Sequence, residues 1–264
     1  MTAETSPEAP PFSELPRPRL LGVHYHVVDR ADLFDAIATA VARPLPSTIL
    51  NVNTRAMNIA QYDTEYRDLL NRADLVFVDG AGVQLGAKLV GKPVGERLTP
   101  MDWIDEFFER CSEQQWPIFF LGDTEAMRER FAAKIIEKHP NCPLVDSHHG
   151  FFDQQGEEND ALIERINRSG ATMLLVGMGM PVQEKWLWAN RDKLTIPVRF
   201  SIGALNRVYT GDIARGPAWM TNNGMEWLYR LCVQPGQTWR RYILGNPLFI
   251  GRVLARRLTF RSSD

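Results

Sequence analysis

An aspartate that could act as a general base follows a short apolar run. Residues 74–78 (DLVFV) are followed directly by Asp79, Gly80, Ala81 and Gly82. A carboxylate at the end of a strand, beside glycines that let a substrate approach closely, can remove a proton from that substrate. An aspartate in this position can also simply cap the next helix. The residues alone leave both roles open for Asp79.

A glycine-rich segment follows another apolar run. Residues 172–176 (TMLLV) lead into GMGMPVQE, which contains Gly177, Gly179, Gln183 and Glu184. The glycines expose backbone N–H groups, and a helix predicted from about residue 181 adds positive potential, so the segment suits a diphosphate. Val182 stands where the GxGxxG fingerprint requires its third glycine, which disfavours a nicotinamide-dependent oxidoreductase. A plain tight turn is the alternative.

Amides and an arginine are further candidate ligands. Asn51 and Asn53 end the first predicted strand, and Asn58 follows on a helix. Their paired donors and acceptors could bind a sugar or a uracil edge, although such residues also serve as turn and cap residues. Arg97 could bind a diphosphate bidentately, and the alternative for it is an ordinary surface arginine.

Metal-ligating patterns are weak in this sequence. His148 and His149 have no matching carboxylate or cysteine cluster nearby, and the chain contains no Asp-x-Asp pair. Three cysteines lie far apart without CxxC spacing, which predicts reduced, buried thiols. We therefore expect neither a metal nor another cofactor.

Apolar runs alternate with amphipathic segments along most of the chain. This alternation predicts an α/β fold: a Rossmann-like, mostly parallel sheet with helices on both faces and a small helical C-terminal appendage. In such sheets, ligands bind outside the carboxyl ends of the strands, where the candidate residues stand. The predicted strands are residues 48–52, 74–78, 117–121, 142–146, 172–176 and 198–202, and the clearest helices are residues 65–73, 81–90, 125–138 and 159–168.

Charge is distributed unevenly between the two ends of the chain. The 264 residues carry a net charge of −2, yet residues 227–264 contain seven arginines and one acid, so this segment is +6 and the remainder −8. The sequence contains no run of about 18 consecutive apolar residues, so it predicts no membrane-spanning helix. We expect a disordered tail (residues 1–18) without a secretory signal, a catalytic domain (19–222), and a basic appendage (223–264) that docks on an anionic membrane surface.

Several motifs together resemble those of one family. The order NVN, VDG, ER-L-x-x-x-D, FFLGD, GFF, LLVGMGMPVQEKW, IGA, TGDIARGPAW and GMEWLYRL, followed by QP and WRRY, is similar to the WecG/TagA/CpsF glycosyltransferases. The resemblance runs from about residue 20 to about residue 258, and GxGxPxQE with EWLYRL are its most specific parts.

This resemblance implies an inverting transfer from a UDP-sugar to an undecaprenyl-diphosphate-linked saccharide, in cell-surface polysaccharide synthesis. For such an enzyme, the absence of an Asp-x-Asp pair predicts metal-independent chemistry. The resemblance implies a cytoplasmic protein at the inner face of the cell membrane and no nucleic-acid partner, and it leaves a homo-oligomer open. Asp79 matches the proposed base of the family. The implied donor or diphosphate ligands are Asn51, Asn53, Gly80, Arg97, Gly122, Gly177, Gly179, Gln183 and Glu184, and the implied acceptor or membrane contacts are Arg215, Arg230, Arg240 and Arg241.

The sequence also departs from the family pattern. Asn51, Pro100, Val182 and the pair Leu205-Asn206 replace a threonine, a glycine, a lysine and an FD pair. These departures leave the donor open among N-acetylmannosamine, its uronic acid and glucose. A catalytically inactive, membrane-bound partner of a polysaccharide assembly complex is the alternative, and the intact Asp79 and QE pair argue against it.

Overall fold

The computed structural model describes residues 12–261 and contains one six-stranded parallel sheet. Its strands lie in the order β4-β3-β8-β7-β5-β6, and a small antiparallel hairpin stands apart from them. The strands of the sheet are β3 (Ser47–Val52), β4 (Leu75–Val78), β5 (Ile118–Gly122), β6 (Leu144–His148), β7 (Met173–Gly177) and β8 (Val198–Ser201).

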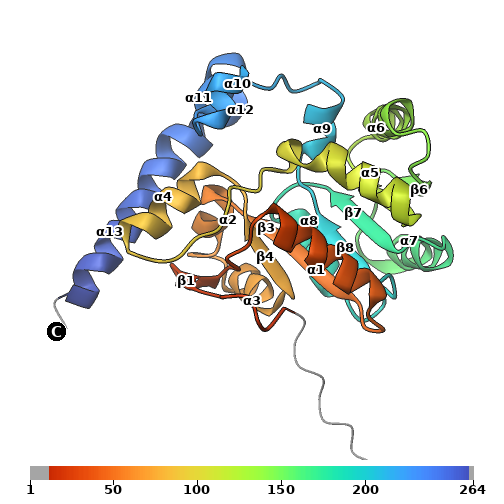
Figure 1. The fold of residues 1–264 in the computed structure, drawn as a ribbon, viewed down its shortest axis with the longest axis horizontal. Coiled ribbons are helices and arrows are strands. Elements are labelled where there is room, and N and C mark those ends of the chain that lie inside the picture. The colour runs from red at the N-terminus through yellow and green to blue at the C-terminus, as the bar shows by residue number, and fades with distance from the viewer. Residues whose placement is uncertain (1–11, 262–264) are drawn as a thin grey trace, which may run out of the picture.

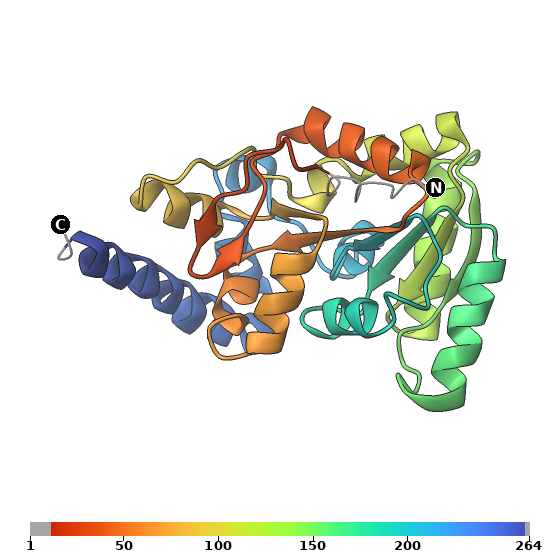
Figure 2. The ribbon, with the colours of Figure 1, turned by 90° about the horizontal axis from the view of Figure 1, so that it is seen from below.

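Helices cover both faces of this sheet, as Figure 2 shows with the layers on opposite sides of the strands. Every residue of β3, β4, β5, β7 and β8 is buried, which explains their continuous apolar runs. Alternate side chains serve two cores: Ile49, Phe77 and Phe120 belong to one, Leu50 and Val78 to the other. The predicted α/β class is thereby confirmed.

Each core has its own helices. The first core is covered by α1 (Arg30–Ala42), α5 (Ile104–Gln114), α6 (Glu125–Lys138) and α9 (Leu205–Tyr209), with the short turn η1 (Pro100–Asp102) leading into α5. The second is covered by α2 (Thr54–Ile59), α3 (Thr64–Arg72), α4 (Ala81–Leu89), α7 (Gly156–Arg168) and α8 (Val182–Ala189), together with part of α13 (Asn246–Arg261).

The segment predicted as a disordered tail is partly ordered. Residues 1–11 lie outside the described residues. Phe12 and Leu15 pack against the first core, and the Arg17 guanidinium donates to the backbone oxygen of Asn71 at 2.6 Å. The prediction is therefore wrong for residues 12–18, because these side chains find partners on distant elements. The hairpin β1 (Arg19–Leu20) and β2 (Val23–His24) follows directly.

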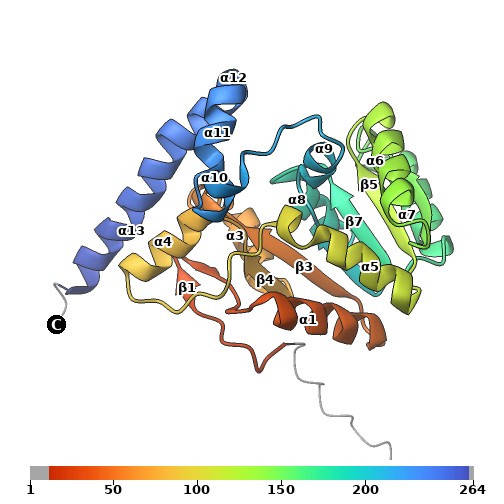
Figure 3. The same cartoon turned by 45° about the horizontal axis from the view of Figure 1, so that its top comes forward.

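The C-terminal segment forms α10 (Ala218–Asn222), α11 (Glu226–Val233) and then one continuous helix. That helix consists of α12 (Pro235–Trp239), the π-helical turn η2 (Arg240–Gly245) and α13. The wide π turn ends at Gly245, and the helix continues through Pro247. Figures 1 and 3 show α13 running alongside α4.

The structure also bears on membrane-spanning helices and on the burial of the cysteines. Among residues 12–261 there is no helix long and apolar enough to cross a membrane. Cys111 and Cys142 are buried as predicted, whereas Cys232 is exposed on α11, so the prediction is wrong for that thiol.

Candidate active site

A cavity of about 630 Å³ lies at the carboxyl ends of four neighbouring strands. Its floor is formed by residues that follow β4, β3, β8 and β7, and its roof by residues of α11, η2 and α13. The strand ends meet there because all strands of the sheet are parallel. Eight of the predicted site residues line it: Asn51, Asn53, Asp79, Gly80, Arg97, Gly179, Arg230 and Arg241.

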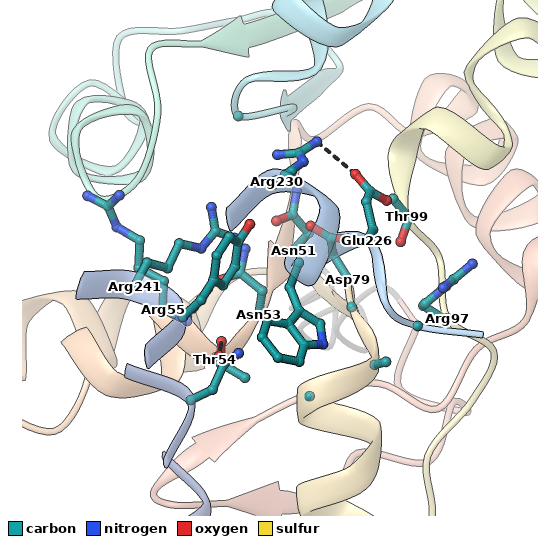
Figure 4. A pocket seen from close by; sticks show the side chains of 18 of the residues that line it. Asn51, Asn53, Thr54, Arg55, Asp79, Arg97, Thr99, Glu226, Arg230 and Arg241 are labelled. Carbon is teal, nitrogen blue, oxygen red and sulfur yellow. Dashed lines mark hydrogen bonds and ion pairs between the residues drawn. The ribbon is translucent and has the colours of Figure 1, made fainter. Parts of the chain in front are cut away.

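Asp79 lies at the centre of the labelled side chains in Figure 4. It does not cap α4, because the N-cap position is Gly80 and no side chain caps that helix. Burial raises the pKa of the Asp79 carboxyl, although the cavity gives it partial access. Arg241, Arg230 and a hydrogen bond with the Thr99 hydroxyl oppose that rise in pKa, whereas Glu226 adds to it.

The roof of the cavity brings charges that sequence reasoning partly missed. Glu226 on α11 forms an ion pair with Arg230, with 2.8 Å between Oε1 and Nη2 (Figure 4). Arg241 approaches from η2, beside the half-exposed Trp227 and the buried Tyr242. Glu226 and Trp227 were present in the EWLYRL motif, but nothing in the sequence showed that α11 folds back over the strand ends.

The asparagines of the first motif have different roles. Asn51 is 2% exposed and donates from Nδ2 to the Ser201 backbone oxygen, while its Oδ1 has no partner among the described residues. An unpaired buried acceptor beside a cavity is suited to an N–H or O–H group of a ligand. Asn53 caps α2 by accepting from the Arg55 and Ala56 amides, so the cap alternative is confirmed for it.

Asn58 serves the roof rather than the cavity. Its Nδ2 donates to the Gly245 backbone oxygen at 2.7 Å, and its Oδ1 accepts from Arg252 at 2.7 Å. Thr54 donates to Asn246 at 2.8 Å nearby. These contacts fasten the C-terminal helix to α2.

Arg97 lines the cavity but is held by Asp102. Its Nη2 lies 3.1 Å from the Asp102 carboxylate, which also forms an ion pair with Arg215. Arg97 donates in addition to the backbone oxygen of Thr221 in α10. Asp102 in η1 therefore links Arg97, in the loop before η1, to Arg215, in the segment that leads into α10. Arg215 is not among the residues that line the cavity.

Gln183 and Glu184 are buried beneath the cavity and do not line it. Gln183 Oε1 accepts the backbone N–H groups of Gly179 and Gly203, at 3.2 and 3.1 Å, and both glycines line the cavity. Gln183 Nε2 in turn donates to Glu184 Oε1 at 2.6 Å. Gln183 thus links the Gly179 loop to the Gly203 loop. It also accepts the N–H of Gly179, a group that the sequence predicted to face a phosphate.

Gly122 and Gly177 lie away from the cavity wall, where strand ends approach closely. A Cβ on Gly122 would lie 2.5 Å from the Gly177 backbone oxygen, so the packing of β5 against β7 requires glycine there. Arg240 is exposed on the roof, with its guanidinium over the Trp239 ring. The donor role predicted for the two glycines and the acceptor or membrane role predicted for Arg240 stay predictions.

The described residues contain no group of three or more His, Cys, Asp or Glu side chains placed to hold one metal ion. The rings of His148 and His149 are in contact at the end of β6, with 4.3 Å between centroids and a tilt of 38°, and neither residue lines the cavity.

A cavity at the strand ends of a parallel α/β sheet is where enzymes of this fold class bind ligands, and the arginines around this cavity suit a phosphorylated ligand. Residues 18–263 match the model of the glycosyl transferase WecG/TagA/CpsF family. The chain belongs to this family and is a glycosyltransferase.

Curated relatives carry more specific names. Proteins of Staphylococcus aureus strains MRSA252 and NCTC 8325 / PS 47 are named N-acetylglucosaminyldiphosphoundecaprenol N-acetyl-beta-D-mannosaminyltransferase. Each is 24% identical to this chain over 238 residues, which cover 89% of this chain and 91% of the relative.

Proposed function

We propose that this enzyme transfers N-acetylmannosamine from a UDP-linked donor to a saccharide on undecaprenyl diphosphate, with inversion at the anomeric carbon. The names of the relatives favour N-acetylmannosamine and an N-acetylglucosamine-bearing acceptor. Its uronic acid and glucose are the other donors to be tested, because the sequence departs from the family pattern at Asn51 and Val182.

The observation that carries this proposal is the setting of Asp79. Its carboxylate reaches the cavity between the strand ends and the arginines of the roof. In the proposed reaction, Asp79 takes the proton of an acceptor hydroxyl while that oxygen attacks the anomeric carbon, and the bond to the UDP oxygen breaks on the opposite face. The raised pKa of the Asp79 carboxyl makes it a stronger base than an exposed aspartate.

Positive side chains are proposed to stabilise the leaving diphosphate. Arg230 and Arg241 extend from the roof into the cavity, and Arg97 lines another part of its wall. Guanidinium groups that face developing negative charge lower the barrier without a metal ion. Addition of EDTA should therefore leave the rate unchanged, whereas a loss of activity that Mg²⁺ restores would contradict the metal-free mechanism.

The test of the base is Asp79→Asn. We expect kcat to fall by about 10²–10⁴-fold, because the amide cannot accept the proton, while UDP binding changes little. The measurement is acceptor extension followed by mass spectrometry, with purified protein, a panel of UDP-sugars and a short-chain lipid-diphosphate acceptor. Thr99→Val, which removes only the hydroxyl that contacts Asp79, should have a much smaller effect. Full activity of Asp79→Asn would rule out this base.

The appendage is proposed to bring the site to the acceptor at the inner face of the cell membrane. Trp227, Trp239 and Leu248 are exposed on it, between 40% and 50%, so these three can contact lipid. Tyr242 and Phe249 of the same appendage are buried, because η2 and α13 pack against the body.

A further inference from the structure

Arg230, one of the arginines that line the cavity, already has a carboxylate partner there. Arg230 and Glu226 lie one helical turn apart on α11, and their side chains are 20% and 17% exposed. Both residues line the cavity, and Arg230 Nε has no partner among the described residues. The guanidinium therefore retains donor capacity beyond its pair with Glu226.

A diphosphate is a better partner for this guanidinium than a single carboxylate is. It carries more negative charge and offers several oxygens in the spacing that a guanidinium binds bidentately. Glu226 shares the helix and the cavity wall of Arg230, so carboxylate and diphosphate compete for the same N–H groups.

We propose that Glu226 is a placeholder for the donor diphosphate: it holds Arg230 at the cavity wall and releases it when the diphosphate binds. Only the identity of the natural diphosphate, a UDP-sugar, rests on the proposed function. The exchange itself requires a diphosphate of any origin.

The exchange has a consequence for Asp79. The charged groups that face Asp79 are Arg241 from η2 and Glu226 and Arg230 from α11, and the Thr99 hydroxyl contacts it from the loop before η1. Glu226 raises the pKa of Asp79, and Arg230 lowers it. A diphosphate that draws Arg230 away leaves the Glu226 carboxylate unpaired beside Asp79. Binding of the donor then makes the base stronger, so Glu226 is a positioning residue for both Arg230 and Asp79.

The test is a double-mutant cycle measured by calorimetric binding of UDP and, separately, of inorganic pyrophosphate. Glu226→Gln keeps the size of the side chain and removes its charge, so we expect diphosphate binding to tighten by about five-fold, the range of a partly exposed ion pair. In the Arg230→Gln background the same substitution should change binding less than about two-fold, because there is no guanidinium to release. Removal of a negative charge without any exchange would tighten binding equally in both backgrounds.

The matched control is Glu164→Gln on α7, which removes another acid from a Glu–Arg pair of the same spacing, outside the cavity. It should leave diphosphate binding unchanged. Glu226→Asp, which retains the charge but withdraws it from Arg230, is a second variant and should tighten binding to an intermediate degree. Unchanged or weaker binding in both Glu226 variants, or a gain that persists without Arg230, overturns the proposal.

The kinetic readout is the pH profile. In Glu226→Gln the acidic limb of kcat/KM should move to lower pH, because the substitution removes a group that raises the pKa of Asp79. The two proposals fail in different ways. If pyrophosphate binds and shows the expected coupling between Glu226 and Arg230, but UDP does not bind, the proposed donor is contradicted and the exchange still stands. If UDP binds but Glu226 and Arg230 show no coupling, the exchange is contradicted and the proposed donor still stands.

Discussion

Buried polar side chains set the geometry of the cavity floor. Gln183 satisfies the amides of two glycine loops with one oxygen, and Glu184 orients the amide of Gln183. Burial raises the pKa of Glu184 to about 7, since a carboxylate in this position loses its hydration and Oε2 has no partner among the described residues. The floor is therefore sensitive to pH near neutrality.

Glu184→Gln tests this pH dependence. A carboxyl group whose pKa is about 7 when folded, against 4.5 when unfolded, destabilises the folded state progressively as the pH rises from 4.5 to 7. The glutamine variant cannot ionise and escapes this penalty. The difference in free energy of unfolding, variant minus wild type, should therefore be larger at pH 8 than at pH 4.5, by up to about 3 kcal/mol. Denaturant unfolding at both pH values measures the difference. Glu109→Gln, an exposed change on α5, is the control, and an equal pH dependence in wild type and Glu184→Gln would contradict the prediction.

The placement of the roof depends on the packing of α13 against α4 and α2. Phe249 is fully buried in this contact, and a Cβ on Gly86 of α4 would lie 2.7 Å from its ring. Arg241 precedes Phe249 on the same continuous helix, so the contact also positions this arginine. Two helices distant in sequence thus decide where a cavity arginine lies.

Gly86→Ala tests the contact between α4 and α13. The added methyl group must displace the Phe249 ring from its packing against α4, so we expect a loss of about 1–3 kcal/mol in the free energy of unfolding. Acceptor extension should also slow, because displacement of α13 moves Arg241. The matched control is Gly251→Ala on α13, where no atom outside the helix lies within 4 Å of the added Cβ, and it should stabilise the helix by about 0.5–1 kcal/mol. Equal stability of Gly86→Ala and the wild type would refute the packing argument.

At the scale of the whole molecule, the appendage combines a buried side with an exposed apolar one. Phe249 and Val253 complete the second core, whereas Ile243, Leu244 and Leu248 are 52%, 55% and 50% exposed. Exposed apolar side chains beside arginines suit the headgroup region of an anionic membrane. The proposed lipid-linked acceptor would then reach the cavity from the side of the roof.

A triple substitution of Ile243, Leu244 and Leu248 by serine tests membrane docking. Partitioning onto vesicles that contain an anionic lipid should fall by about ten-fold or more, since each apolar side chain contributes through its burial. Sedimentation with the vesicles measures this, and circular dichroism verifies the fold. Ile136→Ser on α6, where the side chain is 53% exposed, is the control and should not change partitioning. Unchanged partitioning of the triple variant would show that the lipid contact lies elsewhere.

The class of fold and the residues able to bind or react with a ligand follow from the amino-acid sequence. Continuous apolar runs predicted β3, β4, β5, β7 and β8 within a residue, because a strand buried on both faces must be apolar throughout. Asp79, Gly80 and the glycine loop after β7 could be placed at strand ends for the same reason. The edge strand β6, which is mostly half-buried and contains polar residues, was predicted two residues too early. The two-residue strands β1 and β2 were missed, since they are too short to show a period.

Which of these residues share a cavity depends on how distant segments pack together. Arg230, Arg241 and Glu226 stand more than a hundred residues after Asp79, and no local pattern shows that α11 and η2 fold over the strand ends. Gln183 and Glu184 look like ligands in the sequence, yet they lie beneath the floor because one oxygen satisfies two backbone amides there. Local patterns record the burial of each residue, whereas the meeting of distant side chains depends on how the helices pack against the sheet and against one another.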